Sequence, residues 1–339
     1  MKDRKKTLLN SIIFLTLIFI TYYIIFREQN LYELYKQIRQ LNIYYLLLAA
    51  LVMLLYFIVE AYNIKSILTS FKEKMHLPKM LRYTLIGFFF SSITPGATGG
   101  QPMEVYYLTK EDIKVSHSTM ALLIHLCGCQ ISSVSLGIIG IILKPHILDN
   151  GLIYFFIVGS LLNTIPITIT IIGIFFPKLA LKLVHLLMKL LKFLKIKNID
   201  KINKKVTSEL EIYQESANYI KNNKGKFIKA ILVAFTQIIV YYIVPFLIYK
   251  SFGLKGQTII DFIFLQAILH STVCSMPLPG SVGVTETVFL LIYGLAYPNN
   301  LLQSALLVNR FVNFYLFVFI SLIVYIFTKI KLDKEKNNL

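Results

Sequence analysis

An arginine and a glutamate within apolar stretches are the residues of this sequence best placed to do chemistry. Arg310 lies well inside the last apolar stretch, and Glu286 follows a proline- and glycine-rich turn within another. Ionisable groups inside a bilayer are costly, so they indicate binding or transport sites by default. The planar guanidinium can hold a lipid phosphate through two parallel hydrogen bonds. The alternative, weighed evenly, is an interior salt bridge between Glu286 and Arg310 that only stabilises the fold.

The turn before Glu286 has a counterpart in the first half of the chain, because Ser91–Gly100 and Ser275–Val284 carry proline and glycine at matching places. Glycine lets the backbone take positive φ and approach a ligand closely, and unpaired N–H groups would suit a phosphate. Close packing of helices is the alternative explanation of the same glycines. We favour binding because the turns form a matched pair. The predicted substrate-binding residues of the turns are Pro95, Gly96, Gly99, Gly100, Pro279, Gly280 and Gly283.

Other polar residues lie near these turns or within predicted spans. His125 lies near the start of the span after the first turn, as the arginine does after the second, so it joins Glu286 and the turn residues as a substrate-binding candidate. A hydrogen bond between helices is the simpler interpretation of this histidine. We expect Glu104 to be solvated at the exit of the first hairpin, and Glu60 and Asn63 to lie at the membrane interface. His270 precedes the second turn and is expected to line the cavity.

No signature of soluble enzyme chemistry is present in the sequence. Pro95–Gly100 is not a nucleotide phosphate loop, since no strand precedes it and no Lys-Ser/Thr pair follows. The histidines never occur at metal-ligand spacing, and the cysteines lie in apolar stretches as small buried hydrophobes. We therefore expect no metal and no cofactor. Any driving force would come from an ion or proton gradient, or lipids would simply equilibrate.

Membrane-spanning helices are the elements that must position these residues. Of the 339 residues, 56% are hydrophobic and 15% charged, which leaves too little polar surface for a soluble domain of this length. A helix that crosses the roughly 30 Å hydrocarbon core needs about 20 mostly apolar residues. Six stretches satisfy this requirement: Leu8–Phe26, Ile43–Ala61, Ser116–Leu143, Leu152–Phe176, Phe227–Tyr249 and Leu301–Thr328.

The distribution of basic residues predicts the orientation of these spans. The formal net charge is +18, and the basic residues lie between apolar stretches, which favours an anionic membrane surface over nucleic acid. The basic stretches at 1–6, 62–82, 177–229 and beyond 328 are therefore expected to be cytoplasmic, together with both termini. If a broken apolar stretch crossed the membrane fully, basic stretches after it would lie outside. The two broken stretches, Leu81–Leu108 and Ile259–Leu295, are therefore expected to leave the membrane on the side they entered.

The predicted fold class is all-α: a polytopic integral membrane protein with about six full transmembrane helices and two re-entrant hairpins in an inverted repeat. The first membrane half is residues 1–176 with its hairpin at 81–109, and the second is 227–339 with its hairpin at 259–295. A basic cytoplasmic linker, 177–226, joins them. Within it, Leu179–Leu194 alternates lysine with leucine and phenylalanine, which predicts an amphipathic helix on the anionic inner leaflet.

Three short motifs resemble, in order and spacing, the membrane domain of the lysylphosphatidylglycerol synthases: Pro95-Gly96-x-x-Gly99-Gly100-x-Pro102, Pro279-Gly280-x-x-Gly283-x-x-Glu286 and Asn309-Arg310. The resemblance covers roughly Leu8 to Phe327. It implies a multi-pass protein of a bacterial-type cytoplasmic membrane that moves aminoacylated phospholipid between leaflets, while a separate soluble domain makes that lipid. Two features depart from the family: we expect no attached aminoacyl-transferase domain, and Ala121–Cys127 lacks the arginine and acid found there in the family.

We therefore expect a lipid transporter or flippase-like protein that handles anionic, including aminoacylated, phospholipid. Two alternatives stay open. One is a phosphatidylglycerol lysyltransferase-type enzyme linked to cationic-peptide resistance, although the chain offers no evident aminoacyl-transferase site. The other is a membrane scaffold for a separate synthase. The expected partners are phospholipid head groups and the anionic inner leaflet, with a synthase as a further partner, and no nucleic acid.

Overall fold

A computed structural model describes residues 31–143, 152–176, 217–273 and 278–337. It also describes the single positions 16, 23, 179, 182, 186 and 189. Every regular element within these ranges is helical, which confirms the all-α class. Of the predicted first span Leu8–Phe26, the structure describes only Thr16 and Tyr23. The predicted amphipathic stretch Leu179–Leu194 also lies outside the described ranges apart from four isolated positions.

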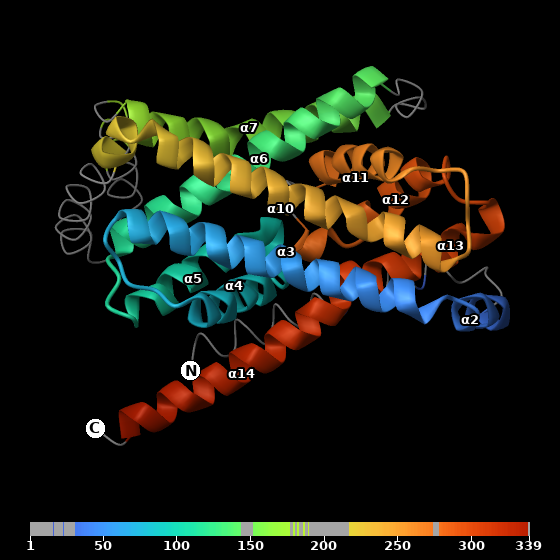
Figure 1. Cartoon of the computed structure of the whole chain (residues 1–339), viewed down its shortest axis with the longest axis horizontal. Helices are drawn as coiled ribbons and strands as arrows, with labels where there is room; N and C mark the ends of the chain where they lie inside the picture. The colour runs from blue at the N-terminus through green and yellow to red at the C-terminus, as the bar shows by residue number, and fades with distance from the viewer. Residues whose placement is uncertain are drawn as a thin grey trace.

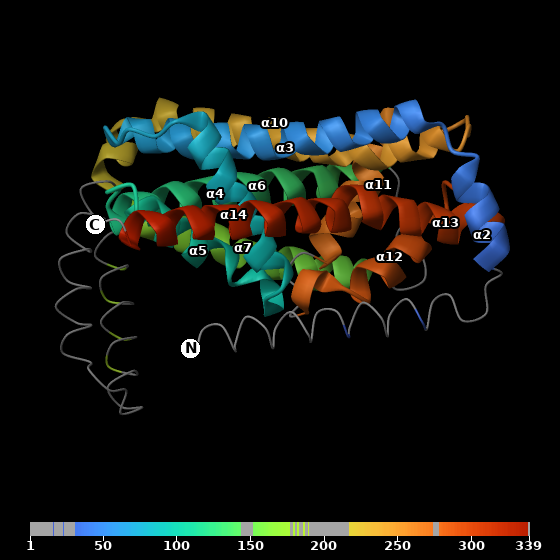
Figure 2. The ribbon, with the colours of Figure 1, turned by 90° about the horizontal axis from the view of Figure 1, so that it is seen from below.

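Five helices in the described ranges are long and apolar enough to cross a membrane. They are α3 (Ile43–Ser70), α6 (Val115–Leu143), α7 (Leu152–Phe175), α10 (Lys224–Ser251) and the continuous unit of α13 (Asn299–Arg310), η4 (Phe311–Tyr315) and α14 (Leu316–Asn337). They match five of the six predicted spans. In Figures 1 and 2 they run along the long axis of a bundle, and the short helix α2 (Leu31–Arg39) leads into it at one end.

The helices pack in a continuous series. α3 packs along α10, α10 along α6, and α6 along both α7 and α11. Figure 2 shows α3 and α10 as a layer on one side of the bundle, with α6 and α14 next to it. We call the end where α3 and α14 finish and α10 begins the lysine-rich end. It carries Lys65, Lys72, Lys74, Lys79, Lys110, Lys114, Lys221, Lys224, Lys226, Lys229, Lys329 and Lys331.

Two broken hairpins enter this bundle from opposite ends (Figure 1). The first consists of α4 (Leu77–Ser92), η1 (Pro95–Ala97) and α5 (Gly100–Thr109). The second consists of α11 (Ile259–Val273), η3 (Pro279–Ser281) and α12 (Val284–Tyr293). The longest of these helices has 16 residues, or about 24 Å at 1.5 Å per residue, too short to cross a hydrocarbon core of about 30 Å. Each hairpin folds back on itself, since α4 packs on α5 and α11 on α12.

The two turns contact each other and share one backbone shape. η1 contacts η3, and Figure 2 shows them side by side near the middle of the long axis. Gly96 has φ 58° and ψ 27°, and Gly280 has φ 57° and ψ 15°. The next residue also has positive φ in both turns, 55° at Ala97 and 50° at Ser281. Positive φ costs a non-glycine residue about 1–2 kcal/mol, so contacts elsewhere in the fold must compensate for this strain.

The match between the turns ends two residues after the glycine. ψ is −14° at Thr98 but 138° at Val282, so the chain leaves the two turns in different directions. At Gly100 in the first hairpin, a Cβ atom would lie 1.9 Å from Ser91 Oγ and 2.8 Å from the Gly87 carbonyl oxygen. Gly100 therefore permits close packing of α5 on α4, the role that small residues commonly have between membrane helices.

The helix of the second predicted span is longer than the apolar stretch that predicts it. α3 continues to Ser70, so Glu60 and Asn63 lie within the helix and not at its end. Asn63 is fully buried and Glu60 is partly buried. The stretch after Ala61 contains lysine, serine and asparagine, which lowers its hydropathy. Its packing against α10 nevertheless extends the helix beyond the apolar stretch.

Candidate functional site

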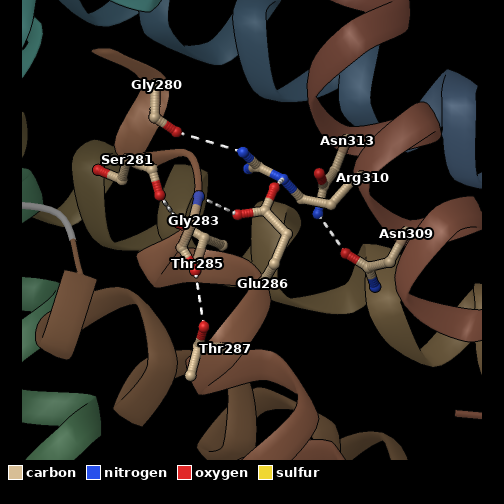
Figure 3. Close-up of polar contacts among 9 residues, drawn as sticks. All are labelled: Gly280, Ser281, Gly283, Thr285, Glu286, Thr287, Asn309, Arg310 and Asn313. Carbon is tan, nitrogen blue, oxygen red and sulfur yellow. Dashed lines mark hydrogen bonds and ion pairs between the residues drawn. The ribbon is translucent and has the colours of Figure 1, made fainter. Parts of the chain in front are cut away.

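Glu286 and Arg310 form a buried ion pair between the second hairpin and the last span (Figure 3). The Arg310 Nε atom lies 2.8 Å from Glu286 Oε1, and the two side chains are 7% and 0% accessible. α12 carries the glutamate in its first turn, and α13 carries the arginine at its last residue. Residues 24 positions apart in the chain are thus joined by one charge-assisted hydrogen bond.

The second carboxylate oxygen of Glu286 is also used, because the Gly283 N–H donates to Oε2 at 2.7 Å. Gly283 is the N-cap of α12 and has φ 91°, a conformation open to glycine and strained for other residues. Glu286, three residues on, thus reaches back as the acid of a capping box. This geometry corrects one expectation: the Gly283 N–H is not an unpaired donor waiting for a phosphate.

Arg310 also holds the second turn. Its Nη2 atom donates to the Gly280 carbonyl oxygen at 3.2 Å. The guanidinium carbon lies 4.4 Å from the centre of the Phe314 ring and 5.5 Å from that of Tyr315, so aromatic faces cover the cation. The second turn, which Arg310 holds, contacts the first turn, because η3 contacts η1.

A π-helical turn follows the arginine and presents these aromatic rings. η4 covers Phe311–Tyr315 and joins α13 to α14, and such turns often occur at functional sites. Asn313 donates to the side-chain oxygen of Asn309 across this irregular turn. The Asn309 amide nitrogen is buried without a hydrogen-bond partner in the described residues. Sequence reasoning missed this turn; its only signal was a pair of asparagines four residues apart in an apolar span.

A second polar network joins α3, α6 and α10 and contains His125. The His125 Nδ1 atom is 3.2 Å from Asn63 Nδ2, which also donates to the Ala230 carbonyl oxygen at 2.9 Å. Since Nδ2 can only donate, His125 Nδ1 must accept, which places the ring proton on Nε2 in the neutral tautomer. Nε2 lies 3.7 Å from Glu60 Oε1, and Gln237 donates to Glu60 Oε2 at 3.2 Å.

Glu104 was expected to be solvated, and that prediction was wrong. Its relative exposure is 6%, and its Oε2 atom is buried without a hydrogen-bond partner in the described residues. The carboxylate packs against Gly87 on α4, where a Cβ atom would lie 2.3 Å from Oε1. The packing of α5 on α4 thus encloses this side chain, which no local pattern in the sequence reveals.

The structure brings some of the predicted site residues together and separates others. Gly280, Gly283, Glu286 and Arg310 meet in one cluster, with Pro279 buried at its edge. Pro95 and Gly96 are exposed on a turn that contacts η3, while Gly99 and Gly100 pack against α4. His125 belongs to the other network. His270 lies 3.1 Å from Ser133 Oγ and 2.9 Å from the Tyr242 hydroxyl, so it joins α11 to α6 and α10.

A metal centre is not formed within the described ranges, where no group of three or more His, Cys, Asp or Glu side chains is placed to hold an ion. Cys127 is buried and Cys129 partly buried as free thiols, and Cys274 lies outside the described residues. The guanidinium of Arg310 thus holds a carboxylate, and the same planar donor geometry suits a phosphate.

Residues 8–321 match the family described as the lysylphosphatidylglycerol synthase TM region. This match covers all the described helices up to the first part of α14, including both hairpins and the Glu286–Arg310 pair. A comparison with curated proteins found none that matches the chain.

Proposed function

Because the chain belongs to the lysylphosphatidylglycerol synthase transmembrane-region family, we propose that it is a lipid transporter of the flippase type. Its substrate would be an anionic phospholipid, including aminoacylated forms, moved between the two leaflets. The observation that carries this proposal is the contact between η1 and η3, two Pro-Gly turns that enter the bundle from opposite ends. Paired broken helices that meet within the membrane are typical of transporter binding sites.

Irregular backbone at membrane depth supports the same function. Non-helical segments are tolerated there only when protein or a water-filled cavity surrounds them. Both turns also hold positive φ at a non-glycine residue, Ala97 in one and Ser281 in the other. A fold that served only as an anchor would gain nothing from two strained turns that contact each other. Such strain typically persists at binding and switching sites.

Arg310 would bind the phosphate of the lipid in this proposal. Glu286 neutralises the arginine when no lipid is bound, so an entering phosphodiester would replace the carboxylate on the guanidinium. Glu286 would keep its hydrogen bond from Gly283, which remains in place when the ion pair opens. The exchange keeps the guanidinium paired with an anion throughout, and the released Glu286 carboxylate would need a proton or another cation to balance its charge.

The proposed topology follows the lysine distribution. The lysine-rich end and both termini would face the cytoplasm, and the second turn would open toward the outer side. Residues 1–176 and 227–339 would form two halves of an inverted repeat joined by the 177–226 linker. The matched φ and ψ at Gly96 and Gly280 support this relation between the halves.

Transport can be tested with purified protein in liposomes that contain fluorescent phosphatidylglycerol in both leaflets. Dithionite then bleaches only the accessible outer leaflet unless lipid crosses the bilayer. We expect nearly complete bleaching with the wild type, and in protein-free liposomes only loss of the outer-leaflet label. Equal bleaching in both samples would refute the transport proposal.

The same preparation separates the alternative functions. Formation of lysylphosphatidylglycerol from phosphatidylglycerol and lysyl-tRNA would assign the chain as a lysyltransferase. A preparation that neither moves nor makes lipid, but co-purifies with a soluble synthase, would be a scaffold. The family description favours a connection to the synthase reaction in all of these cases.

A further inference from the structure

A basic pocket opens between α3 and α10 at the lysine-rich end of the bundle. Its volume is about 330 Å³, and its lining includes Tyr62, Lys65 and Ser66 from α3 and Lys226, Lys229 and Ala230 from α10. It lies apart from the Glu286–Arg310 cluster, which is built from α12, α13 and η3.

Helical spacing explains why these side chains share the pocket. The α3 residues lie at positions 62, 65, 66, 67, 69 and 70, and those of α10 at 226, 229 and 230. Residues three and four apart lie on one face of a helix, so Tyr62, Lys65 and Thr69 share a face of α3, and Lys226, Lys229 and Ala230 share a face of α10. Because α3 and α10 pack along each other, the two faces line the same pocket from either side.

The lining of the pocket is positively charged, and none of the residues that line it is an aspartate or glutamate. Across the described ranges, Lys65, Lys226 and Lys229 form no ion pair. Lys226 contacts a neutral phenol, since it donates to the Tyr219 hydroxyl and lies 4.9 Å from the centre of that ring. The pocket therefore differs from the Arg310 site, where a carboxylate already neutralises the cation.

Apolar surface continues from the pocket along both helices. On α3, Leu51 is 61% and Leu55 44% exposed, and they share a helical face with Tyr62. On α10, Leu232 is 60% exposed one turn beyond Lys229. A cationic pocket at the end of two spans, followed by apolar faces, is complementary to an anionic phospholipid, which has a charged head group and then acyl chains.

We propose that this pocket binds the phosphodiester head group of an anionic phospholipid from the leaflet at the lysine-rich end. The acyl chains would lie along the exposed faces of α3 and α10. The inference deepens the proposed transport function and rests on it for one point, the use of the pocket as the place where lipid is loaded. The polar network of His125 begins directly behind the pocket, because Asn63 donates to the carbonyl oxygen of Ala230.

The test compares lipid binding by matched variants of the purified full-length protein, measured by native mass spectrometry with short-chain phosphatidylglycerol. The test variant replaces the pocket lysines, K65Q/K226Q/K229Q. The control variant K36Q/K250Q/K255Q removes the same charge from the opposite end. We expect the pocket variant to bind phosphatidylglycerol about tenfold more weakly or worse, and the control to stay near the wild type. Equal affinity of the two variants would overturn the proposal.

The choice of ligand separates a lipid from a free anion. Inorganic phosphate is expected to compete poorly with phosphatidylglycerol, because it cannot use the apolar faces. Competition at equal concentration would assign the pocket to free phosphate and overturn the lipid proposal. Equally tight binding of phosphatidylcholine would show that the lysines do not select for charge, which also overturns it.

A second measurement covers the case in which the triple variant does not fold. Phosphatidylglycerol should protect Lys65 and Lys229 of the wild type from an amine-reactive reagent, and leave Lys250 and Lys255 unprotected. Absence of such protection would refute the pocket. Binding and transport fail separately: lipid bound without movement across the bilayer refutes the proposed function alone, while transport without binding here refutes the pocket alone.

Discussion

Substitution of Glu286 and Arg310, singly and together, distinguishes a head-group site from a structural ion pair. The perturbations are Glu286→Gln, Arg310→Leu and the double variant. Removing one partner of a buried ion pair leaves an uncompensated charge and costs about 3–5 kcal/mol. Glutamine keeps an acceptor for the Gly283 N–H, so Glu286→Gln removes the charge without removing the cap of α12.

The double variant should recover most of the stability. It removes both charges of the pair, and one remaining defect is the Gly280 carbonyl oxygen, which loses the donor Arg310 Nη2. An unsatisfied buried acceptor costs about 1–3 kcal/mol. We therefore expect single variants roughly 3–5 kcal/mol less stable than the wild type, and a double variant that is intermediate. The thermal midpoint of the purified protein, followed by size-exclusion chromatography after heating, measures this order.

Transport decides between the two roles. If Arg310 binds the lipid phosphate, the double variant folds but moves no phosphatidylglycerol in the dithionite assay. Arg310→Lys should fold and transport poorly, because lysine keeps the charge but loses the planar fork and its contact with Phe314. Restored lipid movement in the double variant would refute the head-group role and leave a purely structural ion pair.

Four further predictions follow from individual contacts. Gly100→Ala should lower stability by about 1–3 kcal/mol, because its Cβ would lie 2.8 Å from the Gly87 carbonyl oxygen, whereas Gly225→Ala, with nothing within 4 Å, should not; thermal midpoints compare the two. Glu104→Gln should raise the thermal midpoint at neutral pH, since it removes the charge of a buried carboxylate with an unpartnered oxygen, and a fall would contradict the assignment. Partial burial favours the neutral Glu111 carboxyl, but hydrogen bonds from Lys79 and Tyr83, both 2.6 Å, hold its pKa below the ordinary value of about 4.3. Its stabilising effect should therefore be complete above about pH 4.3 and be lost as pH falls through the lower folded-state pKa, so the midpoints of wild type and Glu111→Gln should differ at pH 7 and converge in acid. In a cysteine-free background, Glu111→Cys and Asn300→Cys should react with a membrane-impermeant reagent from opposite sides, and labelling of both from one side would disprove the predicted topology.

Most of the fold could be predicted from the sequence because membranes impose strong local rules. A span needs a long apolar run, so α3, α6, α7, α10 and the last span were evident from composition alone. The two Pro-Gly turns were evident as interruptions of such runs. The charge pattern then required each broken segment to return to its own side, which agrees with the way α4 packs on α5 and α11 on α12.

The candidate site was only partly predictable. Glu286 and Arg310 stood out because a single ionisable residue in an apolar run is costly inside a bilayer and therefore indicates a function. Whether they faced each other or a ligand depended on how α12 meets α13, and the sequence left those alternatives even. Glu104 and Glu60 lie at the ends of apolar stretches, where local pattern predicts solvent, yet packing against Gly87 and α10 covers them.

The sequence by itself determined which segments enter the membrane, where they break, and which residues carry charge into it, since each of these depends on the cost of transferring a residue from water. Only the tertiary structure decided that η1 and η3 meet, that Gly283 and Gly280 occupy the two ends of the Glu286–Arg310 pair, and that a π turn covers the guanidinium with Phe314. These contacts join helices from distant parts of the chain. Their geometry follows from how complete helices pack against one another, which no short window of residues contains.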